Sequence, residues 1–265
     1  MLGSRIATAL VGAPLLLLAV WLGGPLYYAL IGLLGGLALW ELHRMLGLPG
    51  GTIGMTSLFG VAAGWYLAIG FGRPPTGLVL AALAVGITTW RQVRLQRRGG
   101  GVGNAGIWFA STYVGFCLGH FPALRGLEQG LALTLLVFLA TWAFDTAAYF
   151  AGTKYGVHKM APRLSPGKSW EGALAGSAAV LLMAMLLLRG IGLSPGLRLG
   201  IGVGVIIFGQ LGDLFESSLK RLAQVKDAGT ILPGHGGVLD RFDSLMFSVP
   251  VAYYFALLWS GYVRG

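Results

Sequence analysis

The chain has 265 residues, of which 55% are hydrophobic and only 11% are charged, whereas about 25% of the residues in a soluble domain are charged. This composition excludes a soluble globular domain and predicts an all-α, polytopic integral membrane protein. A single cysteine, Cys117, excludes an intrachain disulfide. The net charge of +10 reflects few acids rather than a basic domain, so no nucleic-acid partner is expected.

Nine apolar stretches are long enough to cross a bilayer, which takes about 20 residues. They cover residues 6–23, 25–43, 52–71, 75–90, 104–123, 130–151, 170–189, 197–219 and 241–262. The first stretch is long and further stretches follow it at once, so we expect a retained helix and not a signal peptide. Glycines four residues apart predict close helix packing. Examples are Gly60 with Gly64, Gly172 with Gly176, and Gly200 with Gly204.

The basic residues predict an orientation in the membrane. With nine crossings, the N-terminus shares a side with four loops, and these segments together hold fourteen of the 19 lysines and arginines. The positive-inside rule then places the N-terminus in the cytoplasm, in a cytoplasmic (inner) membrane rich in anionic lipid. We expect two regions: N-terminal helices with a basic cytoplasmic loop, Arg91–Arg98, over residues 1–100, and a catalytic region over residues 101–265 with cytoplasmic loops 152–169 and 220–240.

Most acidic residues lie in one part of the chain. Seven of the nine acids and all five lysines lie between residues 145 and 243. Membrane orientation requires no carboxylates, so this mixture indicates a polar site on the cytoplasmic face. Asp145 interrupts the sixth apolar stretch, and Asp213 and Glu216 lie near the cytoplasmic end of the eighth. An unpaired charge there costs a few kcal/mol, so we expect all three to face a polar cavity. The alternative for Asp145 is an ion pair with a neighbouring helix.

Helical spacing groups several of these side chains. Asp213, Ser217 and Lys220 share one helix face, and Asp240 and Asp243, three residues apart, share another. Paired carboxylates from two helices are hard ligands that suit Mg²⁺, which takes further ligands from substrate phosphates. A glycine-rich segment, residues 233–237, would present backbone N–H groups to an anion. The pattern predicts a phosphoryl-transfer site.

Two sets of motifs resemble one known family. Ser217–Arg221, Lys226–Asp227, Leu232–Gly237 and Asp240–Asp243 resemble the signature of the phosphatidate cytidylyltransferase, or CDP-diacylglycerol synthase, family. Asp145–Gly152 and Ser165–Gly172 are similar to its other cytoplasmic segment, with Gly167 in place of a frequent Asn and Lys154 and Lys159 where the family commonly has Arg and Lys. The resemblance covers roughly residues 130 to 265.

The resemblance implies a membrane enzyme that transfers CMP from CTP to phosphatidate, giving CDP-diacylglycerol and pyrophosphate for phospholipid biosynthesis. It also implies a homodimer, with Mg²⁺ on Asp213 and Asp240 and K⁺ as a second cation. The expected catalytic residues are Asp213, Lys220, Arg221, Lys226, Asp227, Asp240, Arg241 and Asp243. The expected substrate-binding residues are Asp145, Lys168, Glu171, Ser217, Gly234, His235, Gly236 and Gly237.

Three other functions are compatible with parts of the sequence. A transporter would also contain intramembrane acids and glycine-broken helices, although the acids here gather at one face and no internal repeat is found. A CTP-dependent polyprenol kinase would share the phosphate site and differ in its products, CDP and a phospholipid. A purely structural membrane scaffold would not explain why the acidic residues are clustered.

Overall fold

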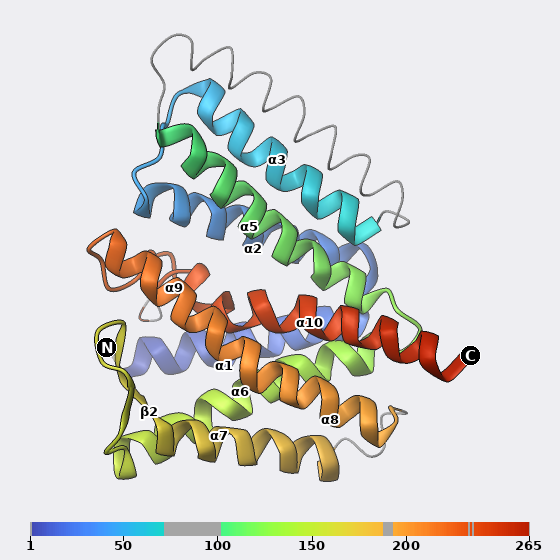
Figure 1. The fold of residues 1–265 in the computed structure, drawn as a ribbon. Helices are drawn as coiled ribbons and strands as arrows, with labels where there is room; N and C mark the ends of the chain where they lie inside the picture. Colours follow the sequence, from blue (N-terminus) through green and yellow to red (C-terminus); the bar gives the residue numbers. More distant parts are fainter. Residues whose placement is uncertain (1, 72–101, 188–192, 233, 235, 265) are drawn as a thin grey trace. The chain divides into compact units, whose positions relative to one another are not determined.

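The computed structural model describes residues 2–71, 102–187, 193–232, 234 and 236–264 (Figure 1). Within these residues, five helices are long and apolar enough to cross a membrane: Gly24–Met45, Gly54–Phe71, Gly130–Tyr155, Pro195–Leu222 and Leu239–Trp259. Two shorter apolar helices, Leu10–Leu22 and Trp170–Met185, accompany them. The prediction of an all-α, multi-pass membrane protein is confirmed, and the count of nine spans stays a prediction. The expected span 75–90 and the Arg91–Arg98 loop lie outside the described residues.

The helices begin and end within a few residues of the apolar stretches that predicted them. They are α1 (Leu2–Leu22), α2 (Gly24–Met45), α3 (Thr52–Phe71), α5 (Val102–Arg125), α6 (Gly130–Tyr155), α7 (Trp170–Leu182) with a π-helical end η1 (Met183–Leu187), α8 (Pro195–Gly204), a π-helical η3 (Val205–Gly209), α9 (Gln210–Leu222) and α10 (Leu239–Arg264). An antiparallel hairpin, β1 (Lys159–Ala161) and β2 (Ser165–Ser169), occupies the expected loop 152–169 and was not predicted.

The chain folds as two compact units. The first comprises Met1–Ala123 with Val225–Arg241, and the second comprises Leu124–Gln224 with Phe242–Gly265. Helix α10 therefore starts in the first unit and continues through the second. The predicted boundary at residue 100 falls outside the described residues, so the functional division into an N-terminal and a catalytic region stays a prediction.

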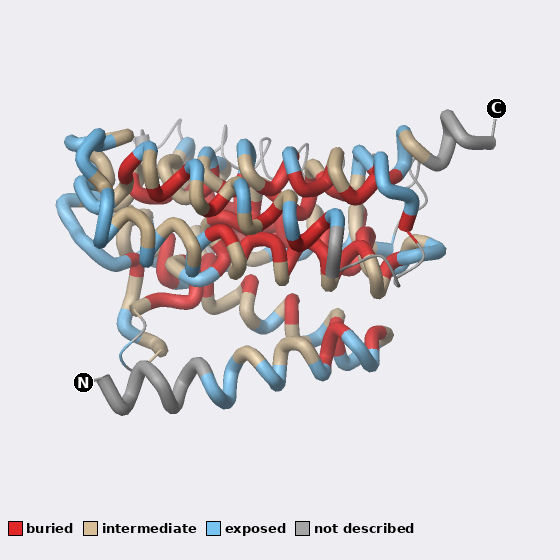
Figure 2. Tube along the Cα trace, turned by 90° about the horizontal axis from the view of Figure 1, so that it is seen from below, coloured by how far each residue is buried: buried red, intermediate tan, exposed pale blue. Residues whose placement is uncertain are grey.

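In the first unit, α2, α3 and α5 pack closely at glycines. A Cβ on Gly35 would lie 2.6 Å from the Leu118 side chain, and a Cβ on Gly115 would lie 2.5 Å from the Ala62 carbonyl oxygen. Buried and exposed positions alternate along the helices, as Figure 2 shows. Gly60 differs from the expectation, because no described atom lies within 4 Å of its Cβ position. The described part of the chain therefore gives no close approach there.

In the second unit, α6 packs against α7 at the predicted glycine pair. A Cβ on Gly172 would lie 2.7 Å from the Ala148 carbonyl oxygen, and one on Gly176 would lie 2.8 Å from the Phe144 ring. Because backbone meets backbone at this contact, larger residues could not be accommodated without separating the helices. The prediction of close packing at Gly172 and Gly176 is confirmed.

A continuous helical rod, α8–η3–α9, packs against α10 through a second line of glycines. Cβ atoms on Gly200 and Gly204 would meet Phe255 and Val251, which confirms this predicted pair, and one on Gly209 would lie 3.1 Å from Ser248 Oγ. The spacing is four residues from Gly200 to Gly204 and five from Gly204 to Gly209. The π-helical η3 adds the extra residue, which keeps the glycines on the face toward α10.

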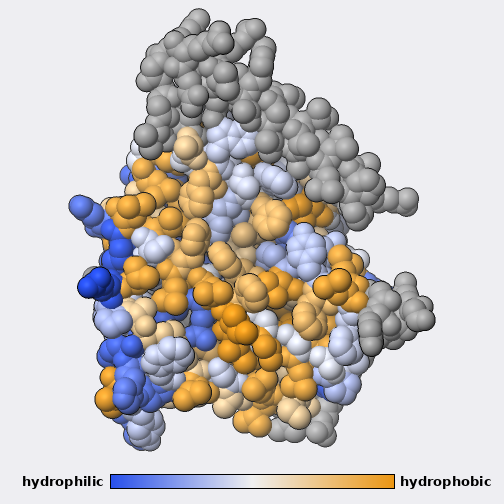
Figure 3. Space-filling model, viewed as in Figure 1, coloured by the Kyte–Doolittle hydropathy of each residue, from blue (hydrophilic) through white to orange (hydrophobic). Residues whose placement is uncertain are grey.

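The surface of the second unit matches a protein surrounded by lipid. Large apolar side chains on its helices are exposed, among them Leu174, Leu182 and Leu258. In Figure 3 apolar residues cover the lengths of the helices, whereas hydrophilic residues gather beside the hairpin and the C-terminal end of α9. The polar end of this unit is where the site residues are found.

Candidate active site

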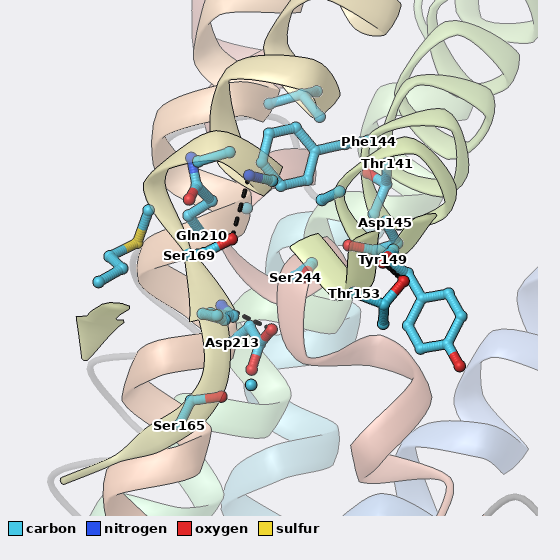
Figure 4. Close-up of a pocket in the computed structure, with 18 residues that line it drawn as sticks. Thr141, Phe144, Asp145, Tyr149, Thr153, Ser165, Ser169, Gln210, Asp213 and Ser244 are labelled. Carbon is cyan, nitrogen blue, oxygen red and sulfur yellow. Dashed lines mark hydrogen bonds and ion pairs between the residues drawn. The ribbon is translucent and has the colours of Figure 1, made fainter. Parts of the chain in front are cut away.

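A cavity of about 340 Å³ opens in the second unit between α6, the hairpin, α9 and α10 (Figure 4). Its lining includes two of the predicted acids, Asp145 from α6 and Asp213 from α9, and the predicted lysine, Lys168 from β2. The other polar lining residues are Thr141, Tyr149, Thr153, Ser165, Ser169, Gln210 and Ser244. The expectation that Asp145 and Asp213 face a polar cavity is therefore confirmed.

Asp213 is held on both carboxylate oxygens. Lys168 Nζ lies 2.7 Å from Oδ2, and the Ser217 hydroxyl donates to Oδ1 at 3.3 Å. The Ser217 contact confirms that the two residues share a face of α9. The side chains of Lys168 and Asp213 are 22% and 27% exposed. An ion pair that is partly shielded from water in this way is stronger than one at an open surface.

Asp243 interacts electrostatically with carboxylates from two other helices at this site. Asp243 on α10 lies within electrostatic range of Asp213, of Asp145 and of the Lys220 ammonium. Lys220 itself forms an ion pair with Glu216, 2.9 Å away, and Glu216 is fully buried. The expectation that Glu216 faces the cavity is not met, because Glu216 is not among the residues that line it. Its spacing of four residues from Lys220 places it in a helical ion pair instead.

The donor chemistry of this group fits a hard divalent cation, because carboxylate oxygens are the ligands that Mg²⁺ takes from proteins. Coordination requires oxygens within about 2.1 Å of the ion, which is much shorter than electrostatic range. Among the described residues, no three or more His, Cys, Asp or Glu side chains are gathered closely enough to hold a metal ion. Substrate phosphates would have to complete a site built on these carboxylates.

The hairpin that carries Lys168 is fixed at both ends. At one end, Ser169 caps α7 by accepting from the Gly172 N–H at 3.2 Å, and the Trp170 N–H donates to the His158 carbonyl at 2.9 Å. At the turn, Arg221 Nε donates to the Leu164 carbonyl at 3.3 Å. These contacts place Lys168 over the cavity from an element that would otherwise be a loop.

Glu171, a predicted substrate-binding residue, contacts the start of the hairpin. Its Oε1 accepts from the His158 backbone N–H at 3.1 Å and lies 2.6 Å from His158 Nδ1. The hydrogen bond from His158 holds the pKa of the Glu171 carboxyl below its ordinary value of 4.5. Glu171 lies at the start of α7, outside the five candidate spans, and its side chain is 28% exposed. This geometry gives Glu171 a role in positioning the hairpin.

A second group of predicted residues lies in the first unit, where Asp240 organises the segment before α10. Asp240 Oδ2 accepts from the Ala228 N–H at 2.9 Å and from the Gly237 N–H at 2.8 Å. Gly234 and Gly236 have φ angles of 76° and 81°, a left-handed conformation that favours glycine. His235 lies outside the described residues, so the anion-binding role of this loop stays a prediction.

The structure thus brings the predicted residues together in two groups. Asp145, Lys168, Asp213, Ser217, Lys220 and Asp243 belong to the second unit, together with Glu171 and Arg221. Lys226, Asp227, Gly234, Gly236, Gly237, Asp240 and Arg241 belong to the first unit. Asp227 lies beside Gly236, whereas Lys226 and Arg241 are exposed. The shared Mg²⁺ site of Asp213 and Asp240 stays a prediction.

Comparisons with known proteins agree on one family. The model of the cytidylyltransferase family matches residues 3–259. The phosphatidate cytidylyltransferase of Bacillus subtilis (strain 168) is 34% identical over 97% of this chain and 98% of its own length. That of Brucella suis biovar 1 is 35% identical over 98% of this chain and 94% of its own. A Staphylococcus haemolyticus relative of the same name is 45% identical over 53% of this chain and 54% of its own.

Proposed function

Because this chain belongs to the cytidylyltransferase family, we propose that it transfers CMP from CTP to phosphatidate, giving CDP-diacylglycerol and pyrophosphate. The observation that carries the proposal is the Lys168–Asp213 ion pair, which lies in a cavity beside Asp145. Lys168 comes from a motif that resembles this family, and the resemblance implies a metal-binding role for Asp213. The pair combines the cation and the carboxylate that a nucleotide phosphate site requires.

The reaction requires little covalent help from the protein. A phosphate oxygen of phosphatidate attacks the α-phosphorus of CTP, and the bond to the leaving pyrophosphate breaks. The nucleophile is already anionic near neutral pH, so the site has to bring two polyanions together and stabilise the leaving group. Lys168 on the fixed hairpin suits this task, because a positioned ammonium binds phosphate without reorganisation.

The remaining roles follow the motifs. We assign Lys168, Lys226 and the 233–237 loop to the phosphates of CTP, and Lys220, Arg221 and Arg241 to charge neutralisation. Asp243 and Asp227 would orient these basic groups. Asp213 and Asp240 are the carboxylates assigned to Mg²⁺, and K⁺ near Asp145 is the proposed second cation. When bound, Mg²⁺ would neutralise negative charge on the nucleotide phosphates and on the pyrophosphate.

We place the enzyme in the cytoplasmic (inner) membrane, with its N-terminus and active site on the cytoplasmic side, as a homodimer. The distribution of lysine and arginine supports this orientation. The hydrophilic hairpin and the polar end of α9 support an active site at an aqueous boundary (Figure 3). Phosphatidate would enter from the bilayer between helices, with its phosphate at the boundary where CTP is dissolved.

The test is to follow the phosphorus atoms of CTP. The purified chain in detergent is given phosphatidate, Mg²⁺ and CTP radiolabelled at the α-phosphate, with CTP radiolabelled at the γ-phosphate in parallel. Label that enters the lipid phase only from the α position, and only when Mg²⁺ is present, supports cytidylyl transfer.

The other outcomes separate the alternatives. Label that enters lipid from the γ position identifies a lipid kinase and overturns the proposal. If folded protein transfers neither label, the proposal also fails, and flux of a solute into proteoliposomes without nucleotide would then identify a transporter.

A further inference from the structure

Glu41 is a buried carboxylate in α2 that belongs to none of the motifs. Only 1% of its surface is exposed, and α2 is one of the candidate spans. A carboxylate in such a place is unfavourable by several kcal/mol unless polar groups compensate for the lost water. The contacts of Glu41 therefore identify the polar groups that compensate for its burial.

Those contacts lie in the segment that precedes α10. Glu41 Oε2 accepts from the Leu239 N–H at 2.9 Å across 198 residues of sequence, and the Val238 N–H lies close enough to interact favourably with this carboxylate. Leu239 is the first residue of α10. A carboxylate at this place satisfies N–H groups that a helix leaves without partners and interacts favourably with the positive end of the helix dipole.

Two glycines of the same segment lie in close contact with the Glu41 carboxylate. A Cβ on Gly237 would lie 2.6 Å from Oε2, and a Cβ on Gly229 would collide with Oε1. Oε1 has no hydrogen-bond partner among the described residues. The segment thus folds around the carboxylate so closely that no side chain larger than hydrogen fits at either position.

Asp240 holds the same segment from its other side. Its Oδ2 accepts from the N–H groups of Ala228 and Gly237. Ala228 directly precedes Gly229, and both Gly229 and Gly237 lie against Glu41. The two carboxylates are close enough to repel each other. The repulsion between the two carboxylates is offset only while the backbone N–H groups that donate to them stay in place. The position of each carboxylate therefore depends on the same short stretch of backbone.

We propose that Glu41 is a positioning residue, which fixes the backbone at Gly229 and at Gly237–Leu239, the start of α10, and thereby presents Asp240 in its active geometry. This inference rests on the proposed function for its kinetic consequence. The structural consequence, order in the segment, does not depend on any reaction.

The first experiment replaces the acceptor. Glu41→Met keeps the length of the side chain and removes both oxygens, whereas Glu41→Gln keeps one acceptor oxygen for Leu239. We expect Glu41→Met to lower kcat/KM for CTP roughly 10- to 100-fold, as for a lost charge-assisted hydrogen bond, and Glu41→Gln to keep most of the activity. The matched control is Glu128→Gln, an exposed carboxylate in the same half of the chain, which should match the wild type.

The second readout is hydrogen exchange without substrate. In Glu41→Met we expect faster exchange of the backbone amides of Ala228, Gly237 and Leu239, with the amides of α3 and α5 unchanged. Unchanged exchange at these three amides would overturn the inference. Equal acceleration throughout the first unit would also overturn it, because that pattern describes a general core residue.

If Glu41→Met does not fold, a pair of substitutions that enlarges residue 229 and shrinks residue 41 tests the same contact. Gly229→Ala should loosen the segment by colliding with Glu41, and Glu41→Ala with Gly229→Ala should exchange more slowly than Gly229→Ala alone, because the collision is gone. Gly36→Ala is the control on the same helix, since its nearest described neighbour, in the Phe59 ring, is 3.9 Å away. Simple additivity of the two substitutions would overturn the inference.

The two proposals fail separately. Suppose that the wild-type chain transfers no CMP, but hydrogen exchange at Ala228, Gly237 and Leu239 is still faster in Glu41→Met. Then the proposed function is wrong and the positioning role of Glu41 stands. If the wild type is active and Glu41→Met has wild-type kinetics and exchange, the positioning role is wrong and the proposed function stands.

Discussion

Lys168 and Asp213 are joined by a 2.7 Å ion pair, although one lies on a hairpin and the other on a transmembrane helix. The pair fixes the only charged group of the hairpin that lines the cavity, within the described residues. It also places an ammonium group directly beside the carboxylate of Asp213. This relationship leads to the first prediction.

Lys168→Met should lower kcat/KM for CTP by about 100-fold, the effect expected when one partner of a shielded charge pair is removed. The variant loses the ammonium that would bind a phosphate and leaves Asp213 without its cation. The matched control is Lys159→Met on the neighbouring strand, where the side chain is exposed. Steady-state kinetics at varied CTP concentrations would give kcat/KM for both variants. Equal kcat/KM values for Lys168→Met and Lys159→Met would contradict the assignment of Lys168.

Asp240→Asn and Asp240→Ala should differ, because the structure gives Asp240 two separable tasks. The Asn side chain can still accept from Ala228 and Gly237, whereas Ala cannot. We expect Asp240→Asn to lose at least about 100-fold in cytidylyl transfer while hydrogen exchange of the segment stays as in the wild type. Asp240→Ala should lose cytidylyl transfer and should also show faster hydrogen exchange in the segment. Activity of Asp240→Asn that is restored by high Mg²⁺ would remove Asp240 from the metal ligands.

The helices could be predicted from sequence because lipid leaves the backbone few alternatives to a long apolar helix. The hairpin could not, since its two strands are short and polar and depend on distant contacts such as Arg221 with Leu164, which is 57 residues away. The π-helical η3 was also missed. Its only trace in the sequence is the change from four-residue to five-residue glycine spacing, which is visible once the partner helix is known.

The site was predictable where its contacts are local. Helical periodicity placed Ser217 beside Asp213, and the structure confirms it. Periodicity could not pair Lys168 with Asp213, because Lys168 was expected in an irregular loop, to which no helical period applies. Glu41 was missed for a different reason: it satisfies the same criterion as Asp145, an acid inside an apolar stretch, but it lies far from the cluster of charges.

The contact between Glu171 and His158 should make hairpin stability depend on pH. Because the folded-state pKa of Glu171 is lowered, the contact contributes fully above the ordinary value of 4.5 and is lost as the pH falls through the lower folded-state pKa. We expect Glu171→Gln to lower the unfolding midpoint at pH 7, and the difference from the wild type to shrink in acid. A difference that grows as the pH falls would contradict this sign.

Gly172→Ala tests whether the close packing of α6 on α7 matters for the site. The added Cβ would lie 2.7 Å from a backbone oxygen, that of Ala148, and 3.2 Å from Ser169 Oγ. Since neither helix backbone can move without displacing the cap that holds the hairpin, we expect a loss of about 1–3 kcal/mol in the free energy of unfolding. Thermal unfolding in detergent would measure it as a lower midpoint.

The matched control for this change is Gly202→Ala, also in an apolar helix of the second unit. Its Cβ would lie 3.5 Å from Val180 and 3.6 Å from Ala184, which is ordinary contact. Replacing glycine by alanine in a helix without a collision stabilises by about 0.5–1 kcal/mol, so this variant should unfold at the same or a higher temperature. If Gly172→Ala is as stable as Gly202→Ala, the α6–α7 contact is looser than the structure indicates, and the hairpin must be held mainly by Glu171 and Arg221.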